Sequence, residues 1–354
     1  MSPDPPRCRS CGCRALEPIL ALGTTPLANA LLTAEQLDGP EEVFPLELVF
    51  CPDCTLVQIT ETVAPDKLFR EYFYQSSFSD TVLENARSIA ERMIARCHLG
   101  NGDLVVEIAS NDGYLLRNYL RHGIGVLGIE PARNIAAVAE AEGIRTVCEF
   151  FDRALATELR QRGEAADVIH ANNVVAHVAD LHGVVAGIAV LLKDDGVAVI
   201  ENHYVKDLID QVEFDSIYHE HLCYYSVTSF DRLFRRHGLT LVDAERTPMH
   251  GGSLRVFFQR SDGPCSLAAT GAARVRQLLD EEAAWGVADA DFYRGFGVRV
   301  EHLRKELVSL IRQLKDSGER IAVYGASAKS TTLLNYFGIG AESLDYVVDR
   351  STIK

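Results

Sequence analysis

The sequence has little positive charge, and we expect neither a secretory leader nor a membrane segment. Its 35 lysines and arginines face 50 aspartates and glutamates, which gives a formal net charge of −15 at pH 7. This balance argues against a general binder of nucleic acid or anionic membranes, because phosphate affinity needs clustered basic side chains. The opening residues, MSPDPPRCRS, have no apolar core of a signal peptide, and no apolar run approaches bilayer length. We therefore expect a cytoplasmic protein.

Internal repeats and low-complexity tracts are also missing. Of the 354 residues, 47% are hydrophobic and 24% are charged, as in ordinary globular proteins. A chain of this length can bury a sizeable core and form two or three domains. A local basic pocket for a small phosphorylated ligand is compatible with the acidic balance.

Cysteines are concentrated near the N-terminus. All nine are expected to stay mostly reduced in the cytoplasm. Four are isolated and predicted to be small buried hydrophobes, namely Cys97, Cys148, Cys223 and Cys265. Four others form two Cys-x-x-Cys pairs, Cys8 with Cys11 and Cys51 with Cys54, a spacing that predicts four thiolates around a tetrahedral structural Zn²⁺. Cys13 is an alternative ligand with worse spacing, and a redox or fortuitous cluster is the competing interpretation.

Three segments follow one another along the chain. Residues 1–68 are rich in proline and glycine and form the predicted zinc-binding module. Residues 69–240 alternate predicted strands and helices, beginning with a helix over 78–97 and a strand, loop and helix over 103–123. This β–α–β rhythm predicts an α/β domain with a mostly parallel, doubly wound Rossmann-like sheet.

The third segment, 241–354, begins with two predicted strands joined by a turn. A long helical stretch follows over about 266–317, and then RIAVYGASAKSTTLLNY reads as strand, glycine-containing loop and helix before a strand in LDYVVDR. A Rossmann-like unit with only two strands is incomplete, so we expect the C-terminal domain to be truncated.

The loop EIASNDGYLL lacks the three glycines with which dinucleotide-binding proteins approach a pyrophosphate. It begins with an acid, Glu107, which would repel a pyrophosphate but suits the cationic sulfonium and amino group of S-adenosylmethionine. One strand later, Glu130 in GIEPA is placed to accept the two ribose hydroxyls of an adenosine. Either acid alone would be unremarkable at a strand end, but the pair at this spacing favours S-adenosylmethionine over NAD(P).

Two later strand ends complete the predicted cofactor site. CEFFD offers an aromatic pair and an acid for the adenine, and HANNVVAHV supplies polar side chains where methyl transfer would occur. The predicted cofactor-binding residues are Glu107, Ser110, Asn111, Gly113, Glu130, Phe150, Phe151, Asp152, Asn172, Asn173 and His177.

The stretch DSIYHEHLCYY places Tyr218, His219, Glu220 and His221 side by side among aromatic residues. Three interpretations are open: a metal site, a buried core cluster, or acid/base machinery. The stretch lacks the i, i+4 histidines of zinc hydrolases, and methyl transfer from S-adenosylmethionine needs no metal Lewis acid. We therefore favour acid/base machinery.

Six motifs in order give the chain a clear resemblance to a known family. These are the cysteine pairs, EIASNDGYLL, NNVVAHV, IYHEHLCYYS, HGGSLR and GASAKSTTLLNY. The chain resembles the sugar C-methyltransferases that build branched deoxysugars on thymidine-diphosphate carriers in antibiotic biosynthesis. The resemblance implies an N-terminal zinc module, a central S-adenosylmethionine domain and a C-terminal Rossmann-like domain for the sugar nucleotide. Relatives continue past the position of Lys354, which is where this chain departs from the pattern.

The resemblance also implies roles for individual residues. It places Tyr218, Glu220, His221 and Tyr72 in the active site and the four cysteines on the zinc. The substrate-binding residues that it implies are His250, Ser253 and Arg255 in HGGSLR and Ser327, Lys329 and Ser330 in GASAKS. A glycine and small residues leading into a helix, with a lysine, suit a pyrophosphate.

The implied reaction makes a carbon nucleophile. A 4-keto group on a dTDP-linked deoxysugar acidifies the neighbouring hydrogen, a base removes it, and the enolate accepts a methyl group at C3. Such an enzyme needs a tuned base, an enolate stabiliser and a dry site. His221 or Tyr218 is the predicted base, and Tyr72 is a candidate donor to the enolate oxygen. If both His221 and Tyr218 act, they must lie on a turn, because an extended strand would point them to opposite faces.

Other functions remain open from the sequence. O- or N-methylation of a sugar or small metabolite would need no enolate, and a zinc-containing adaptor with a decayed methyltransferase fold would need no chemistry. We expect a monomeric enzyme with a small-molecule substrate and no nucleic-acid or membrane partner.

Overall fold

A four-stranded antiparallel sheet carries the cysteine pairs. In the computed structural model, which describes residues 6–70, 72 and 75–351, the strands are β1 (Glu17–Pro26), β2 (Val43–Phe50), β3 (Val57–Ile59) and β9 (Cys223–Tyr224), in the order β1-β2-β3-β9. The last strand comes from the aromatic motif, far along the chain. It pairs with β3 through Val57–Tyr224 and Gln58–Cys223. The zinc-binding module is therefore completed by the segment that immediately follows His221.

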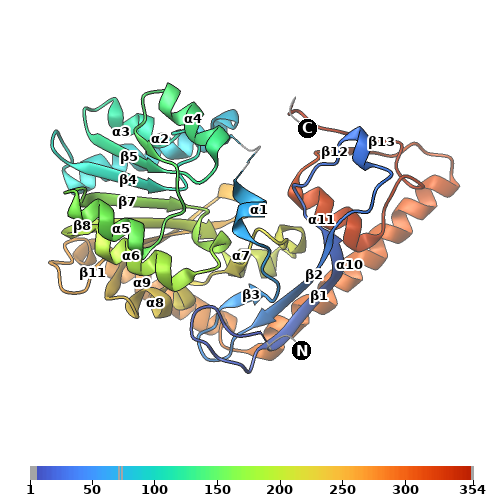
Figure 1. Cartoon of the computed structure of the whole chain (residues 1–354). Helices are drawn as coiled ribbons and strands as arrows, with labels where there is room; N and C mark the ends of the chain where they lie inside the picture. The colour runs from blue at the N-terminus through green and yellow to red at the C-terminus, as the bar shows by residue number, and fades with distance from the viewer. Residues whose placement is uncertain (1–5, 71, 73–74, 352–354) are drawn as a thin grey trace, which may run out of the picture.

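A seven-stranded sheet, here called the central sheet, lies in the left half of the molecule in Figure 1. Its order is β10-β11-β8-β7-β4-β5-β6, with strands β4 (Leu104–Ile108), β5 (Gly125–Ile129), β6 (Thr146–Val147), β7 (Ala166–Asn172), β8 (Leu192–His203), β10 (Leu239–Thr247) and β11 (Ser253–Arg260). The five strands β8-β7-β4-β5-β6 are parallel, and β11 is antiparallel to both of its neighbours. The chain winds one way from β4 and the other way from β7, so ligands are expected at the carboxyl ends of these two strands. The predicted doubly wound α/β sheet is confirmed.

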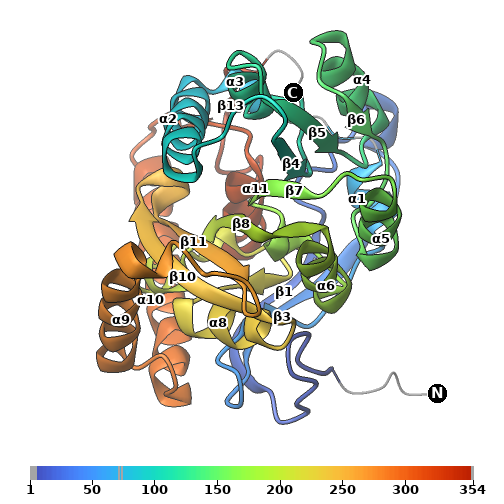
Figure 2. The same ribbon diagram turned by 90° about the vertical axis from the view of Figure 1, so that its left-hand side faces the viewer.

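Helices cover both faces of this sheet (Figure 2). One side carries α2 (Asp80–Cys97), α3 (Leu116–Leu120), α4 (Arg133–Ala141) and α9 (Ala268–Trp285), and the other carries α5 (Arg153–Gln161) and α6 (Leu181–Leu191). Successive side chains of a strand point to opposite faces of the sheet. Val105 therefore belongs to the core cluster under α2 and α3, and Val106 belongs to the cluster under α5 and α6. Both faces are therefore closed to water, and the strand ends remain for ligands.

The hairpin β10–β11 belongs to this central sheet, because β11 is hydrogen-bonded to β8 from Ser253–His203 to Phe258–Ala198. A domain boundary at about residue 240 would separate the hairpin from the sheet that it completes. After the hairpin the predicted helical stretch forms two helices, α9 and α10 (Ala290–Asp316), separated at Gly286, whose φ of +101° is readily adopted by glycine.

The long helix α10 packs against the N-terminal sheet, where Tyr293 stacks on Phe50 with ring centroids 4.5 Å apart. Beyond it lie β12 (Ala322–Tyr324), α11 (Ala328–Phe337) and β13 (Tyr346–Val348), with β12 and β13 paired in parallel. The predicted strand–helix–strand unit is confirmed. One buried cluster extends from Cys8 to Ile339, so the N-terminal sheet, the central sheet and the C-terminal helices share a core. No helix within the described ranges is long and apolar enough to cross a membrane.

Candidate active site

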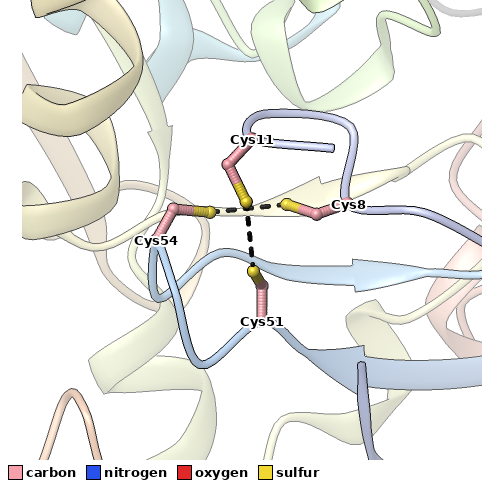
Figure 3. A group of neighbouring side chains, drawn as sticks. All are labelled: Cys8, Cys11, Cys51 and Cys54. Atoms are coloured by element: carbon pink, nitrogen blue, oxygen red, sulfur yellow. Dashed lines mark hydrogen bonds between the residues drawn. The ribbon is translucent and has the colours of Figure 1, made fainter. Parts of the chain in front are cut away.

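The four predicted zinc ligands converge at the turns that precede β1 and join β2 to β3 (Figure 3). Their sulfur atoms all lie within 4.8 Å of one another, and the Cys8–Cys54 and Cys11–Cys51 sulfur pairs are 3.4 Å apart. Each knuckle closes on itself, since Gly12 N donates to Cys8 O and Thr55 N donates to Cys51 O. Both turns therefore point two sulfurs at one centre.

This geometry fits a tetrahedral zinc ion. Zn–S bonds of about 2.3 Å place sulfurs about 3.8 Å apart, close to the spacing here. Hydrogen bonds from Cys51 and Cys54 lower the pKa of the Cys8 thiol to about 4, which favours the thiolate that a metal needs. Cys13 does not belong to the group, and a hydrogen bond with Asp53 raises the pKa of its thiol to about 11.

The cofactor loop follows β4 and is held by the acid at the end of β5. The two carboxylate oxygens of Glu130 accept hydrogen bonds from Asn111 N at 2.9 Å and from Ala132 N at 2.8 Å. Gly113 has a φ of +75°, and a Cβ there would come within 2.7 Å of the Ile144 side chain. The loop is thus tightly folded, with Glu130 at its centre.

Glu107 has the features expected of a ligand for a cation. Its carboxyl is 1% exposed, its Oε2 has no hydrogen-bond partner among the described residues, and burial raises its pKa well above the usual value. An unpartnered buried carboxyl oxygen is costly unless a ligand completes it. Asp112 Oδ1, in the same loop, is also buried without a partner among these residues. The amino group and sulfonium of S-adenosylmethionine would supply the missing partners.

The two phenylalanines and the aspartate after β6 have different contacts. Phe151 is buried against Gly187 of α6, and Asp152 caps α5 by accepting a hydrogen bond from Leu155 N at 2.8 Å. Phe150 is half-buried, and the Arg70 guanidinium lies 4.6 Å from the centre of its ring. Of the two phenylalanines, Phe150 is therefore the more accessible ring on which the adenine could stack.

The loop after β7 joins the cofactor side to the aromatic motif. Asn173 has a φ of +55° and donates its N–H to Glu201 O at 2.6 Å, while Asn172 is half-buried at the strand end. The imidazole of His177 meets that of His221 edge to face, with centroids 4.7 Å apart. Burial lowers the pKa of His177 to about 4, so this ring is neutral at pH 7.

Tyr218 and His221 form a hydrogen-bonded pair. They occupy the ends of a turn closed by His221 N to Tyr218 O at 2.9 Å, as the sequence required if both residues act. His221 Nδ1 donates to Ser216 O at 2.9 Å, because a carbonyl can only accept. The neutral ring therefore has its lone pair on Nε2, which accepts the hydroxyl of Tyr218 at 3.1 Å.

Burial opposes charge on both members of this pair. It lowers the pKa of His221 well below the usual value, with a further contribution from His177, and it raises the pKa of Tyr218 well above 10. The neutral Tyr218–His221 pair is thus the resting state. Proton movement between the two would be driven by a substrate and not by solvent pH.

Glu220 and His219 face the zinc-binding module instead of His221. Glu220 Oε1 accepts a hydrogen bond from Asn29 Nδ2 at 2.6 Å, and burial raises its pKa to about 7. His219 Nε2 donates to Pro45 O at 3.1 Å, and the ring is buried, as a structural histidine would be. The His221 ring is therefore held by Ser216 and not by the neighbouring Glu220.

Tyr72 lies on the segment between the zinc-binding module and α2. It is half-buried, its N–H donates to Asn134 Oδ1 at 3.2 Å, and its ring is 6.1 Å from that of Phe69. Phe69 in turn meets His177 edge to face at 5.7 Å. This chain of rings brings Tyr72 to the same region as the Tyr218–His221 pair.

The predicted substrate residues are only partly brought together. Ser327 caps α11 by accepting from Ser330 N at 3.3 Å, and Lys329 Nζ lies 3.8 Å from Glu213 Oε2. His250, at a φ of +54°, precedes Gly251, which packs against the carboxylate that Lys329 approaches.

Two other predicted substrate residues have structural contacts. Ser253 is buried and donates to Met249 O at 3.0 Å. Arg255 is 4% exposed, and its three nitrogens bind Glu201, Glu245 and Asn85. This saturation leaves Arg255 no free nitrogen for a phosphate, and it argues for a role in holding β11 to β8.

Several site residues carried no recognisable signal in the sequence. Glu213 precedes the turn Phe214–Ser216, Asp215 lies within that turn, and His203 ends β8. The position of His203 could have been found from the rule that ligands bind at the carboxyl ends of strands. The Asn29–Glu220 contact spans 191 positions along the chain and could not.

The fold and the site define a class of protein: a methyltransferase that binds S-adenosylmethionine on a Rossmann-like sheet and carries a four-cysteine zinc module. Three family models match in register, described as "Putative zinc binding domain" over 8–69, "Methyltransferase domain" over 78–244 and "C-methyltransferase C-terminal domain" over 248–354. The chain is 34% identical over 347 residues to C-methyltransferase NovU of Streptomyces niveus, covering 98% of this chain and 82% of that protein. The chain belongs to this family of S-adenosylmethionine-dependent C-methyltransferases.

Solved structures match the chain over about half its length. A methyltransferase from Clostridium acetobutylicum is 13% identical, with a TM-score of 0.42 over 55% of this chain and 96% of that one. Magnesium protoporphyrin IX methyltransferase from Synechocystis, solved with S-adenosylmethionine, is 14% identical, with a TM-score of 0.39 over 51% of this chain and 79% of that one.

Proposed function

We propose that the enzyme methylates C3 of a dTDP-linked 4-keto-deoxysugar through an enolate. The observation that carries this proposal is the Tyr218–His221 pair, which adjoins His177 of the cofactor side at 4.7 Å. A carbon acceptor must lose a proton before it can take a methyl group, and a neutral, half-buried hydrogen-bonded pair is suited to remove it. The sugar nucleotide itself is what the sequence resemblance implies.

The pair would act as a relay. The hydroxyl oxygen of Tyr218 faces the substrate carbon and takes its proton, while the hydroxyl proton passes to Nε2 of His221. Ser216 O stabilises the imidazolium so formed, because it already accepts the Nδ1 hydrogen at 2.9 Å. On this proposal Tyr218 is the base that contacts the substrate, and His221 is the final acceptor of the proton. The two residues that the sequence offered as alternative bases therefore act together.

The remaining residues would hold the two reactants. Glu107 and Glu130 would bind S-adenosylmethionine, which supplies the methyl group. The N-terminus of α11, with Ser327, Lys329 and Ser330, would bind the diphosphate. The expectations of a monomeric, cytoplasmic enzyme in deoxysugar and antibiotic biosynthesis belong to this proposal.

The test is proton exchange at the acceptor carbon. The protein is incubated in D₂O with a dTDP-4-keto-2,6-dideoxyhexose, and deuterium incorporation at C3 is followed by NMR. Labelled S-adenosylmethionine is then added to locate the new methyl group. We expect exchange at C3 and a C–CH₃ product, whereas a methyl group on oxygen or nitrogen would overturn the proposal.

Variants make the same test specific for the relay. Tyr218→Phe and His221→Asn should each lower exchange by about 10²–10⁴-fold, the usual contribution of a positioned acid or base. Their affinity for S-adenosylmethionine should stay within about threefold. His302→Ala, an exposed histidine on α10, is the matched control and should exchange like the unmodified enzyme.

A further inference from the structure

One short turn holds two imidazoles from its opposite ends. The turn η4 (Phe214–Ser216) is preceded by Glu213, and Ser216 N donates to Glu213 O at 3.1 Å. At its far end, Ser216 O accepts from His221 of the relay. At its near end, the carboxylate of Glu213 accepts from His203 Nε2 at 2.9 Å. The two histidines are therefore fixed relative to each other by the same few residues.

His203 lies at the edge of the sheet where folds of this kind bind their ligands. It is the last residue of β8, at the carboxyl end of the central sheet, and it is 8% exposed. The next residue, Tyr204, bridges to Tyr225 just beyond β9, so β8 ends beside the strand that follows the relay. The Nδ1 of His203 bonds to no described residue, which leaves it available to a ligand.

Glu213 is held firmly against His203. Gly251, with a φ of +91°, brings its backbone so close that a Cβ there would overlap the Glu213 carboxylate. From the other side, Lys329 of α11 approaches the same carboxylate at 3.8 Å. A carboxylate confined in this way fixes the orientation of the imidazole that donates to it.

We propose that His203 acts as an imidazolium, whose Nε2–H donates to Glu213 and whose Nδ1–H donates to the carbonyl oxygen of the methyl acceptor and so stabilises the enolate, with Glu213 as its positioning residue. This inference rests on the proposed function. When the C–H bond breaks, the proton goes to the Tyr218–His221 relay and the electron pair moves to the carbonyl oxygen. The carbonyl re-forms as the carbon takes the methyl group, and His203 keeps its own proton throughout.

The charges around His203 suit this role. The hydrogen bond from His203, followed by Lys329, lowers the pKa of Glu213, so its carboxylate is ionised and accepts the Nε2–H of His203. Two other titratable groups nearby are shifted toward their neutral forms, because burial raises the pKa of Asp215 and lowers that of His250. Lys329 balances the charge of the Glu213 carboxylate, so the proposed imidazolium of His203 is the positive group that faces the oxyanion.

Exchange and turnover together test the role of His203. With the same 4-keto sugar nucleotide in D₂O, His203→Ala should lower both C3 exchange and kcat by about 10²–10³-fold, as loss of one oxyanion donor does. KM and the affinity for S-adenosylmethionine should change by less than about fivefold. His203→Gln keeps a neutral donor and should recover part of the loss. Exchange within about threefold of the unmodified enzyme in His203→Ala, or a change confined to KM, would overturn the proposal.

Glu213→Gln tests the positioning role through the split between kcat and KM. Without the carboxylate that orients the ring, C3 exchange and kcat should fall by about 10–100-fold, while KM and the affinity for S-adenosylmethionine change by less than about fivefold. Unchanged exchange, or a change confined to KM, would remove Glu213 from this role. Lys329→Met is the contrasting variant, since a diphosphate contact predicts a raised KM with a smaller change in kcat. Failure of the unmodified enzyme to exchange would refute the proposed function, whereas normal exchange in His203→Ala would refute only the present inference.

Discussion

Removing the side-chain amide of Asn29 should change the ionisation of Glu220 on the other side of the interface between the zinc-binding module and the motif. Glu220 is 5% exposed, and burial raises its pKa to about 7 despite the hydrogen bond from Asn29. A hydrogen bond to a charged group contributes about 1.5–3 kcal/mol. At about 1.4 kcal/mol per pH unit, Asn29→Ala should raise the pKa of Glu220 by a further one to two units, roughly.

The consequence for stability has a definite sign. The folded protein holds the Glu220 proton more tightly than the unfolded chain, whose carboxyl has the ordinary pKa of 4.5. Stability therefore falls as pH rises from about 4.5 to about 7 in the unmodified enzyme. In Asn29→Ala the fall should continue to about pH 8–9. The difference in unfolding free energy between the variant and the unmodified enzyme should therefore be about 1.5–3 kcal/mol larger at pH 9 than at pH 6.

Urea unfolding of the zinc-loaded protein at pH 6 and pH 9 measures this difference, and ¹³C NMR of the Glu220 carboxyl measures the pKa directly. Gln277→Ala is the matched control, because it removes a 2.8 Å amide–carboxylate hydrogen bond to Glu281 on the solvent side of α9. That carboxylate stays hydrated, so the loss of stability should be small and equal at the two pH values. Equal pH dependence in Asn29→Ala and the unmodified enzyme would show that the hydrogen bond does not control Glu220.

Two further predictions concern the zinc site and the central sheet. Chelation should release one zinc ion per chain and abolish C3 exchange, because β3 of the zinc-binding module pairs with β9 beside the relay. The affinity for S-adenosylmethionine should stay within about threefold. Exchange that survives the loss of zinc, with the loss measured by metal analysis on the same sample, would contradict this prediction. Arg255→Met should lower the unfolding free energy by about 3–5 kcal/mol in urea by leaving Glu201 buried and unpaired; a raised KM with unchanged stability would instead support the substrate contact that the resemblance implies.

Residues whose role depends on spacing along the chain were predictable. Two Cys-x-x-Cys pairs can converge on one ion wherever the loop between them runs, and the structure brings their sulfurs within 4.8 Å. Acids at the ends of successive parallel strands meet at one edge, and Glu107 and Glu130 do so around one loop. The turn that joins Tyr218 to His221 followed from the requirement that both act.

Residues whose role depends on burial or on distant partners were not predictable. Phe151, Asp152 and Arg255 have the right residue types for ligand contacts, but a neighbouring helix, a helix end and two acids, one of them buried, occupy them. Glu220 lies next to His221 in the sequence, but its carboxylate accepts from Asn29. Side chains of one type serve either purpose, and only their packing distinguishes the two.

The sequence alone therefore determined the zinc ligands, the doubly wound sheet and the class of reaction, because these follow from periodicity and from short spacings. Only the tertiary structure decided which groups hold the imidazoles. Ser216 holds His221 through a backbone carbonyl, which has no side-chain signature, and Glu213 meets His203 because a turn and a closely packed glycine bring them together. Hydrogen bonds form between atoms that folding makes neighbours, and a linear order does not record those distances.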